Sequence, residues 1–397
     1  MTGILRRMRH GMYVLFVALL IAVTGTVHAE GEEAQERVTQ EDAAKLSEDA
    51  AESLFDELDT DQIDRVLKEA YSREKVRFRD VVQAMMDGEQ TISPELIVDF
   101  VADTLFGLVR ENRPAMLQML LLLIVAAVFT NFSGVFQSSQ IADCAFYIVY
   151  ILLIAVCLTG FSSTTETVEQ GLETLLTFMK VLAPAYFLCM TAATGSVSGM
   201  GFYQLILILI YLVELVIVRF VLPLVHVYLM VQILNYLSGE EYLSKTGELL
   251  EMLISWVMKT MLACVTGVSV IQGILSPAID QVKRSVWTKG AEMLPGIGDA
   301  IGGVTEVVLG TAVLIKNAVG MAGAVLSVGI CLLPILNMGV LTILYKAMAA
   351  VVQPISDKRI VEVLSSMGNA CRMLLSIIFT TSILFLVTIA VTAASTS

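Results

Sequence analysis

Ionisable side chains inside a long apolar run are the feature of this sequence with the most chemical potential. From Ile210 to Leu229 the chain reads IYLVELVIVRFVLPLVHVYL, which places Glu214, Arg219 and His226 among aliphatic residues. A charge held in hydrocarbon is costly, and such groups in membrane segments usually pair with one another or line a polar path. Ion pairing, or a polar path between helices, is therefore the chemistry that these residues could supply.

Two interpretations of this stretch follow from its length. The apolar run from Phe202 to Leu237 is long enough for two spans of about 17 or 18 residues, and Arg219 is the natural place to divide it. Pro223 favours the division, because its nitrogen has no hydrogen to offer the carbonyl of Arg219; Arg219 would then lie at a hairpin tip and reach the headgroups. In the other interpretation the three ionisable residues face a polar path. On one continuous α-helix, Glu214 and Arg219 would point about 140° apart.

Two further polar positions interrupt apolar segments. Lys259 lies inside the segment Leu249–Leu275, where it is either a partner in the bundle interior or a side chain that snorkels to the surface. Lys316 and Asn317 form a polar pair in an otherwise apolar setting. We expect alanine at either position of this pair to impair function while leaving membrane insertion intact.

The residue types that most enzymes need are scarce. Beyond the predicted signal peptide His226 is the only histidine, which argues against a multi-histidine metal site and against Ser-His-Asp or Cys-His catalysis. The six cysteines lie in or beside apolar stretches without a CxxC pair, as small apolar packing residues do. Gly296-x-Gly298 is followed by Ile301 where a dinucleotide fingerprint needs glycine, and no Walker motif occurs. We therefore expect no enzyme activity, no cofactor and no metal.

Composition places most of the chain in lipid. Of its 397 residues 56% are hydrophobic and only 16% are charged, which is unusual for a soluble globular protein. Of the 38 acidic and 25 basic residues, 23 acidic and 10 basic ones lie between Glu30 and Arg113, which leaves 15 of each elsewhere. This acidic segment is not suited to bind nucleic acid, because phosphate binding needs clustered Lys and Arg.

The N-terminus predicts how the acidic segment reaches its compartment. A basic stretch precedes an apolar core from Met12 to Val23 and a small-x-small site that ends at Ala29. This is the pattern of a secretory signal peptide, with an uncleaved anchor helix as the alternative. We predict three parts: residues 1–29 as a signal peptide, residues 30–113 as an exported acidic helical domain, and residues 114–397 as a polytopic membrane domain.

Hydrophobic periodicity predicts an all-α protein. Amphipathic helices are expected over Thr39–Leu58 and from about Asp61 to Asp87, and a third begins at Ser93-Pro94-Glu95. Pro114 begins the lipid section, whose candidate spans are Ala115–Phe132, Cys144–Phe161, Leu175–Gly195, one or two within Phe202–Leu237, Leu249–Leu275, one or two within Asn317–Tyr345, and Met373–Thr392. The prediction is a polytopic helical membrane protein of six to eight spans with a small exported N-terminal helical domain.

Short motifs in the later part of the chain resemble one family. They are Asn235-Tyr236-Leu237-Ser238, Leu243-Ser244-Lys245, Ile271-Gln272-Gly273, Asp280, Pro295-Gly296, Leu314 to Gly320, and Gln353-Pro354-Ile355-Ser356-Asp357. With the order of signal peptide, acidic helical domain and membrane region, they resemble the stage III sporulation protein AE family of endospore-forming bacteria. The motifs cover roughly Leu175 to the C-terminus, whereas the exported domain matches by size and character only. The candidate functional membrane residues are Glu214, Arg219, Lys259, Gln272, Asp280, Glu306, Lys316 and Asn317.

The resemblance implies a membrane subunit of the channel-like complex that joins mother cell and forespore and that late forespore gene expression needs. It implies a place in the mother-cell-derived membrane around the forespore, with the N-terminal domain exported. The implied partners are other membrane subunits, ring-forming subunits similar to secretion-system proteins and, indirectly, a cytosolic secretion-type ATPase, with lipid around the helices and no nucleic acid.

A stand-alone secondary transporter is the competing hypothesis. In that case Glu214, Lys259, Glu306 and Lys316 would form a coupling site at broken helices. An inverted repeat would favour this class, and the sequence shows none.

Overall fold

The structure is a computed structural model that describes residues 53, 60–70, 76–86, 94–132, 139–194, 198–238, 242–291 and 298–394. The predicted signal peptide lies outside the described residues. Apart from Ser53, so does the predicted helix Thr39–Leu58.

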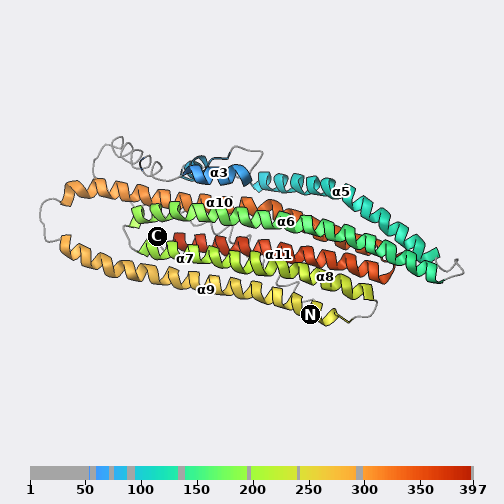
Figure 1. The fold of residues 1–397 in the computed structure, drawn as a ribbon. Coiled ribbons are helices and arrows are strands. Elements are labelled where there is room, and N and C mark those ends of the chain that lie inside the picture. The colour runs from blue at the N-terminus through green and yellow to red at the C-terminus, as the bar shows by residue number, and fades with distance from the viewer. Residues whose placement is uncertain are drawn as a thin grey trace.

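Every regular element in the described ranges is a helix, which confirms the all-α prediction. The elements are α3 (Thr60–Ala70), α4 (Phe78–Met86), α5 (Pro94–Phe132), α6 (Ser139–Thr194), α7 (Ser198–Val213), η2 (Glu214–Val221), α8 (Leu222–Ser238), α9 (Ser244–Ala291), α10 (Gly298–Val352) and α11 (Lys358–Ala394). The long helices lie side by side with nearly parallel axes, and α9 and α10 extend past the others at one end (Figure 1).

Six helices in the described part of the chain are long and apolar enough to cross a membrane. They are nevertheless longer than one crossing requires: α6 has 56 residues, or about 84 Å at 1.5 Å per residue, against a hydrocarbon core of about 30 Å. The predicted spans Cys144–Phe161 and Leu175–Gly195 are joined in α6, which runs through the polar stretch between them and ends at Thr194. The bundle therefore extends well beyond a single bilayer thickness.

Helix α5 is continuous across Pro114, where the lipid section was predicted to begin. The predicted boundary between residues 113 and 114 thus falls inside one helix of 39 residues. Just before it, the side-chain amide of Asn112 donates to the carbonyl of Leu108, 2.8 Å away.

Helices α3 and α4 form a small amphipathic pair. The predicted single helix from about Asp61 to Asp87 is instead two helices, with α3 ending at Ala70 and α4 beginning at Phe78. The backbone N–H of Phe78 donates to Asp64 Oδ1 at 2.7 Å, which ties the start of α4 to α3. Apolar side chains of both helices are buried, and α3 packs against α6 while α4 packs against α10.

Small residues let α6 and α10 approach closely. A Cβ added at Gly171 would lie 3.0 Å from Cγ of Pro334, and one added at Gly323 would lie 2.6 Å from a methyl group of Leu182. Such close approach of backbones is the usual way in which membrane helices gain packing energy in the absence of a hydrophobic driving force. These contacts set the register between α6 and α10, that is, which residues of the two helices lie at the same level.

Two family-like motifs form the turns between helices. The side chain of Asn235 is buried near the end of α8, and its Oδ1 accepts the backbone N–H of Leu243 at 2.7 Å. Between α10 and α11, Asp357 Oδ1 accepts the N–H of Arg359 at 2.8 Å, which caps the first turn of α11. Both contacts position antiparallel helices at the same end of the bundle (Figure 1).

Candidate functional site

The opening stretch of ionisable residues lies on one continuous helix. Helix α7 passes directly into the π-helical segment η2 and then into α8, so the predicted hairpin tip at Arg219 is wrong. The wide π turn provides a physical reason, because the N–H of Leu222 bonds to the carbonyl of Ile217, five residues back, just before Pro223. The helix therefore continues through Pro223, although this residue has no N–H to donate to the carbonyl of Arg219. π-helical segments of this kind occur frequently at functional sites.

The π geometry also changes how Glu214 and Arg219 are related. Residues five apart point well away from each other on an α-helix, but a π-helix bonds residue i to residue i+5 and brings them toward one side. The expected separation of about 140° between these side chains does not apply to this segment.

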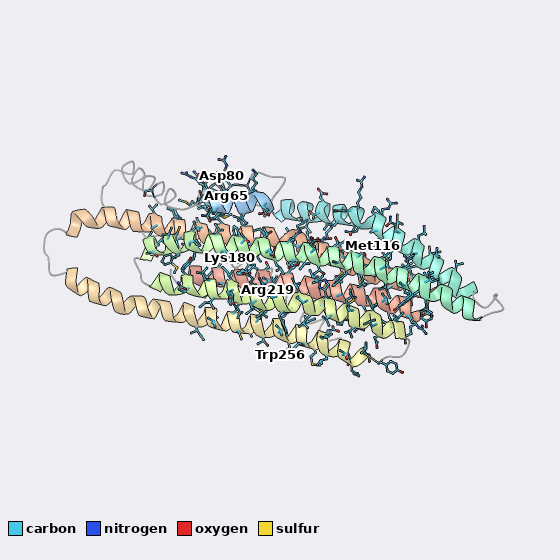
Figure 2. All side chains as sticks on the ribbon, viewed as in Figure 1. Arg65, Asp80, Met116, Lys180, Arg219 and Trp256 are labelled. Atoms are coloured by element: carbon cyan, nitrogen blue, oxygen red, sulfur yellow. The ribbon has the colours of Figure 1, made fainter. Side chains whose placement is uncertain are left out.

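Glu214 pairs with a residue of another helix. Its Oε2 lies 2.9 Å from Nζ of Lys180 on α6, and the two side chains are 36% and 48% exposed. Lys180 lies within the predicted span Leu175–Gly195, and its carboxylate partner is 34 positions along the chain. Figure 2 shows Lys180 and Arg219 on neighbouring helices of the bundle.

A row of polar residues on α6 faces the same way as Lys180. Ser162, Glu166, Glu169 and Glu173 are exposed and recur every three or four residues, which places them on one side of the helix. We call Glu166, Glu169 and Glu173 the acidic stripe. The sequence interpretation missed it because these residues fall between two predicted spans; their helical spacing was the signal that could have identified them.

A cavity opens beside this row, between α6 and α8. It has a volume of about 410 Å³, and its lining comprises Leu158, Thr159, Phe161, Ser162, His226, Leu229 and Met230. His226 Nδ1 lies 3.3 Å from the Leu222 carbonyl oxygen, and its ring meets Phe161 edge-on at a centroid distance of 5.2 Å. Because a carbonyl oxygen only accepts, Nδ1 carries the proton in this contact.

These features form one groove, which we call the α6–α8 groove. The cavity at Ser162 and His226 marks one end of it, and the Lys180–Glu214 pair marks the other. Helical spacing places the acidic stripe on the α6 side between these two ends. The groove lies on the outside of the bundle, and it combines an ion pair, a guanidinium, three carboxylates and a histidine. It can hold water, bind a charged surface or conduct polar solutes.

The remaining predicted residues do not converge on this groove. Lys259 is exposed on α9, whereas Lys316 is fully buried in α10, with Asn317 partly buried beside it. Gln272 and Asp280 lie on α9 and Glu306 lies on α10, and their side chains fall outside the described set.

The distance between Lys316 and the ion pair follows from the α6–α10 contacts. Gly323 on α10 lies against Leu182 on α6. The two helices are antiparallel, so Lys316, which precedes Gly323, is level with a point about seven residues after Leu182 on α6. That point is about nine residues beyond Lys180, or about 14 Å along the axis. Lys316 and Glu214 therefore do not share a site.

Two more interhelical polar contacts were not predicted. Lys346 Nζ donates to Ser365 Oγ at 2.9 Å, which joins α10 to α11. Arg372 on α11 pairs with Glu251 on α9 at 2.9 Å, with side chains 48% and 44% exposed. Among the described side chains, no three His, Cys, Asp or Glu residues are grouped as metal ligands.

Comparison with known proteins assigns the chain to a family. A family model described as stage III sporulation protein AE matches residues 76–396. The stage III sporulation protein AE of Bacillus subtilis (strain 168) is 23% identical over 391 residues, which covers 97% of both chains. No solved structure matches. The chain has six helices suited to a multi-pass membrane protein in the part that the structure describes. It belongs to the stage III sporulation protein AE family, with a role in sporulation.

Proposed function

We propose that this chain is a membrane subunit of a channel-like complex that joins mother cell and forespore and that late forespore gene expression needs. Family membership supports the developmental stage, and six long apolar helices support a place in a membrane. On this proposal it resides in the mother-cell-derived membrane around the forespore, and residues 30–113 are exported.

The observation that carries the proposal is the outward position of the α6–α8 groove. Lys180, Glu214 and Arg219 are at least partly exposed on the side of the bundle, as is the acidic stripe. Hydrocarbon cannot hydrate charged side chains, so groups of this kind need water, headgroups or protein beside them. A subunit whose neighbours complete a wet conduit satisfies that need.

The same geometry disfavours a stand-alone secondary transporter. Such a protein would gather its coupling groups within its own bundle, at broken helices. Here Glu214 is paired on the outer side, Lys259 is exposed on α9, and Lys316 is buried about 14 Å away along the axis. The helix that carries Glu214 is widened by η2 but is not interrupted.

The proposed neighbours are other membrane subunits and ring-forming subunits similar to secretion-system proteins. A cytosolic secretion-type ATPase would act indirectly, since energy coupling by this chain itself would need a nucleotide site. No enzyme activity, cofactor or nucleic acid is part of the proposal.

The proposal is tested by following the tagged full-length chain in sporulating cells. After mild detergent extraction we expect it to migrate in a native gel as an assembly with other membrane proteins. Replacing the acidic stripe with Gln at all three positions should abolish late forespore gene expression while the amount of chain in the membrane stays normal. Glu248→Gln is the matched control, because Glu248 pairs with Lys245 outside the groove. A lone chain in the native gel, or normal expression from the triple variant, would overturn the proposal.

A further inference from the structure

Helix α9 presents an outer face that points away from α7, α8 and α11, the helices against which it packs. Six of its exposed residues recur at helical spacing along this side, and they are Leu249, Met252, Trp256, Lys259, Ala263 and Gly267. We call these six residues the α9 outer face. Trp256 is 63% exposed and lies at the edge of the bundle in Figure 2. A Cβ added at Gly267 would meet nothing within 4 Å, so a second helix can approach closely there.

Lys259 on this face lies at the same level of the bundle as the acidic stripe. Gly247 on α9 lies against Gln232 on α8. The two helices are antiparallel, so Lys259, about 12 residues after Gly247, is level with Phe220, about 12 residues before Gln232. Similarly, the Lys180–Glu214 pair sets the register of α6. Phe220 lies about six residues past Glu214.

On α6, which is antiparallel to this helix, the level of Phe220 corresponds to the position six residues before Lys180, which is next to Glu173. The Lys180–Glu214 pair thus places Lys259 level with Glu173, and the Phe161–His226 contact places it nearer Glu166, so Lys259 is level with the acidic stripe. They lie on different sides of the bundle, because α9 and α6 flank the helix formed by α7, η2 and α8 (Figure 1).

Level matters because copies of a protein in one membrane share its orientation. Copies related by rotation about the membrane normal keep each residue at the same depth, so only residues of equal level can meet across such an interface. A contact between two different faces is heterologous, and repeating it generates a ring when the rotation closes. The α9 outer face and the acidic stripe satisfy this condition.

The charges of the two faces are complementary. The groove carries three carboxylates and one guanidinium beside the neutral Lys180–Glu214 pair, so it is net acidic. Lys259 is the basic residue of the α9 outer face, and none of the ion pairs formed in the described part of the chain includes it. Complementary charge sets partner and register at an interface.

We propose that the α9 outer face of one copy docks against the acidic stripe of a second copy, with Lys259 beside Glu169 and Glu173. Met252 and Trp256, which precede Lys259 on α9, supply apolar contact area. Ala263 and Gly267, which follow it, are small enough for the two helices to approach closely. This inference rests on the proposed function, because it identifies one neighbour of the groove as another copy of the same chain. Repetition of the contact encloses each groove between two copies.

Cysteine cross-linking of the full-length chain in native membranes tests this interface. Cys264 is exposed on α9, so the background is Cys264→Ser. Lys259→Cys combined with Glu173→Cys should give disulfide-linked dimers and larger adducts on oxidation. The control combines Lys245→Cys with Glu173→Cys; Lys245 is exposed but about 21 Å away along α9, and we expect no adduct.

A charge reversal supplies the second readout. With Trp256→Cys and Glu166→Cys as reporters, Lys259→Glu should reduce the adduct several-fold, and adding Glu173→Lys should restore it. Equal adducts from the test and control pairs, or no adduct from the test pair with normal membrane levels, would overturn the interface. Dimers without larger adducts would overturn the head-to-tail arrangement. A large native assembly without these adducts would leave the proposed function standing and would refute the self-contact alone.

Discussion

Lys180 on α6 and Glu214 at the start of η2 form a 2.9 Å ion pair between two helices that are adjacent in space and 34 residues apart in sequence. Both side chains remain partly exposed, so the pair lies on the wall of the α6–α8 groove rather than in the core. It joins α6 to the helix that carries Arg219 and His226. The pair therefore connects the packing of the bundle to its candidate site.

Breaking this ion pair should affect function more than stability. A partly exposed pair contributes about 0.2–1 kcal/mol to folding, so Lys180→Ala should leave membrane levels near normal. We expect the variant to lower late forespore gene expression, because Glu214 would carry an unbalanced charge beside the groove. A reporter gene under late forespore control measures the effect.

The charge swap is the control for this prediction. Lys180→Glu combined with Glu214→Lys should restore expression that each single reversal removes. Failure of the double variant at normal protein levels would show that the identity of each residue, and not the pair, is what matters.

Packing between α6 and α10 should tolerate no large side chain at Gly171. A Cβ there already approaches the rigid ring of Pro334 at 3.0 Å, and overpacking of this kind costs about 1–3 kcal/mol. Gly171→Leu should therefore lower the melting temperature of the detergent-solubilised protein. Gly339→Leu on α10 is the matched control, since an added Cβ there meets nothing within 4 Å. Equal melting temperatures would contradict the described packing of the two helices.

The α8–α9 turn should depend on the side chain of Asn235. Asn235→Ala removes the acceptor of the Leu243 N–H, which is partly buried, and a donor left unpaired away from water costs about 1–3 kcal/mol. We expect a lower thermal midpoint in detergent, with partial recovery in Asn235→Asp, which keeps an oxygen at that place. Asn112→Ala should have a smaller effect, because that side chain bonds only within α5.

Much of the fold follows from local sequence patterns. Helix type and the apolar segments were predictable because periodicity and length are properties of neighbouring residues, as in Met373–Thr392, which α11 contains. The hairpin prediction at Arg219 was wrong because a long apolar run fits two short spans or one long helix equally well. The π segment that decided between them depends on how the whole chain accommodates Pro223.

The candidate site was predictable only in part. Glu214 and Arg219 are conspicuous within an apolar run, but their relation to Lys180 depends on helix packing over a long sequence separation. The acidic stripe was missed because a polar segment between two apolar ones is ordinarily a loop. In this protein it is the middle of a helix of 56 residues.

The buried Lys316 offers a separate test of the candidate residues. Its side chain has no exposed surface, and truncating such a residue removes packing and leaves any polar contact unpaired, at about 3–5 kcal/mol. Lys316→Ala should lower both protein stability and spore yield. Lys316→Met keeps the length of the side chain without its charge, so stability should largely return.

The spore yield of the Lys316→Met variant then shows whether Lys316 is needed for packing or for its charge. If the charge of Lys316 is needed for function, the Lys316→Met variant should give a low spore yield although its stability is normal. Full recovery by methionine would remove Lys316 from the functional set. Asn317→Ala should likewise lower the yield while insertion into the membrane stays normal.

The central claim is that one continuous helix, with Glu214, Arg219 and His226 on its wet side, borders a polar groove. A cysteine scan from Phe202 to Leu237, in the full-length Cys264→Ser chain in native membranes, tests it with a small water-soluble thiol reagent. We predict labelling at Glu214, Arg219 and His226, and at further groove-facing positions every three or four residues. Labelling confined to Arg219 would contradict the account, because it would place a hairpin tip where the structure has a helix.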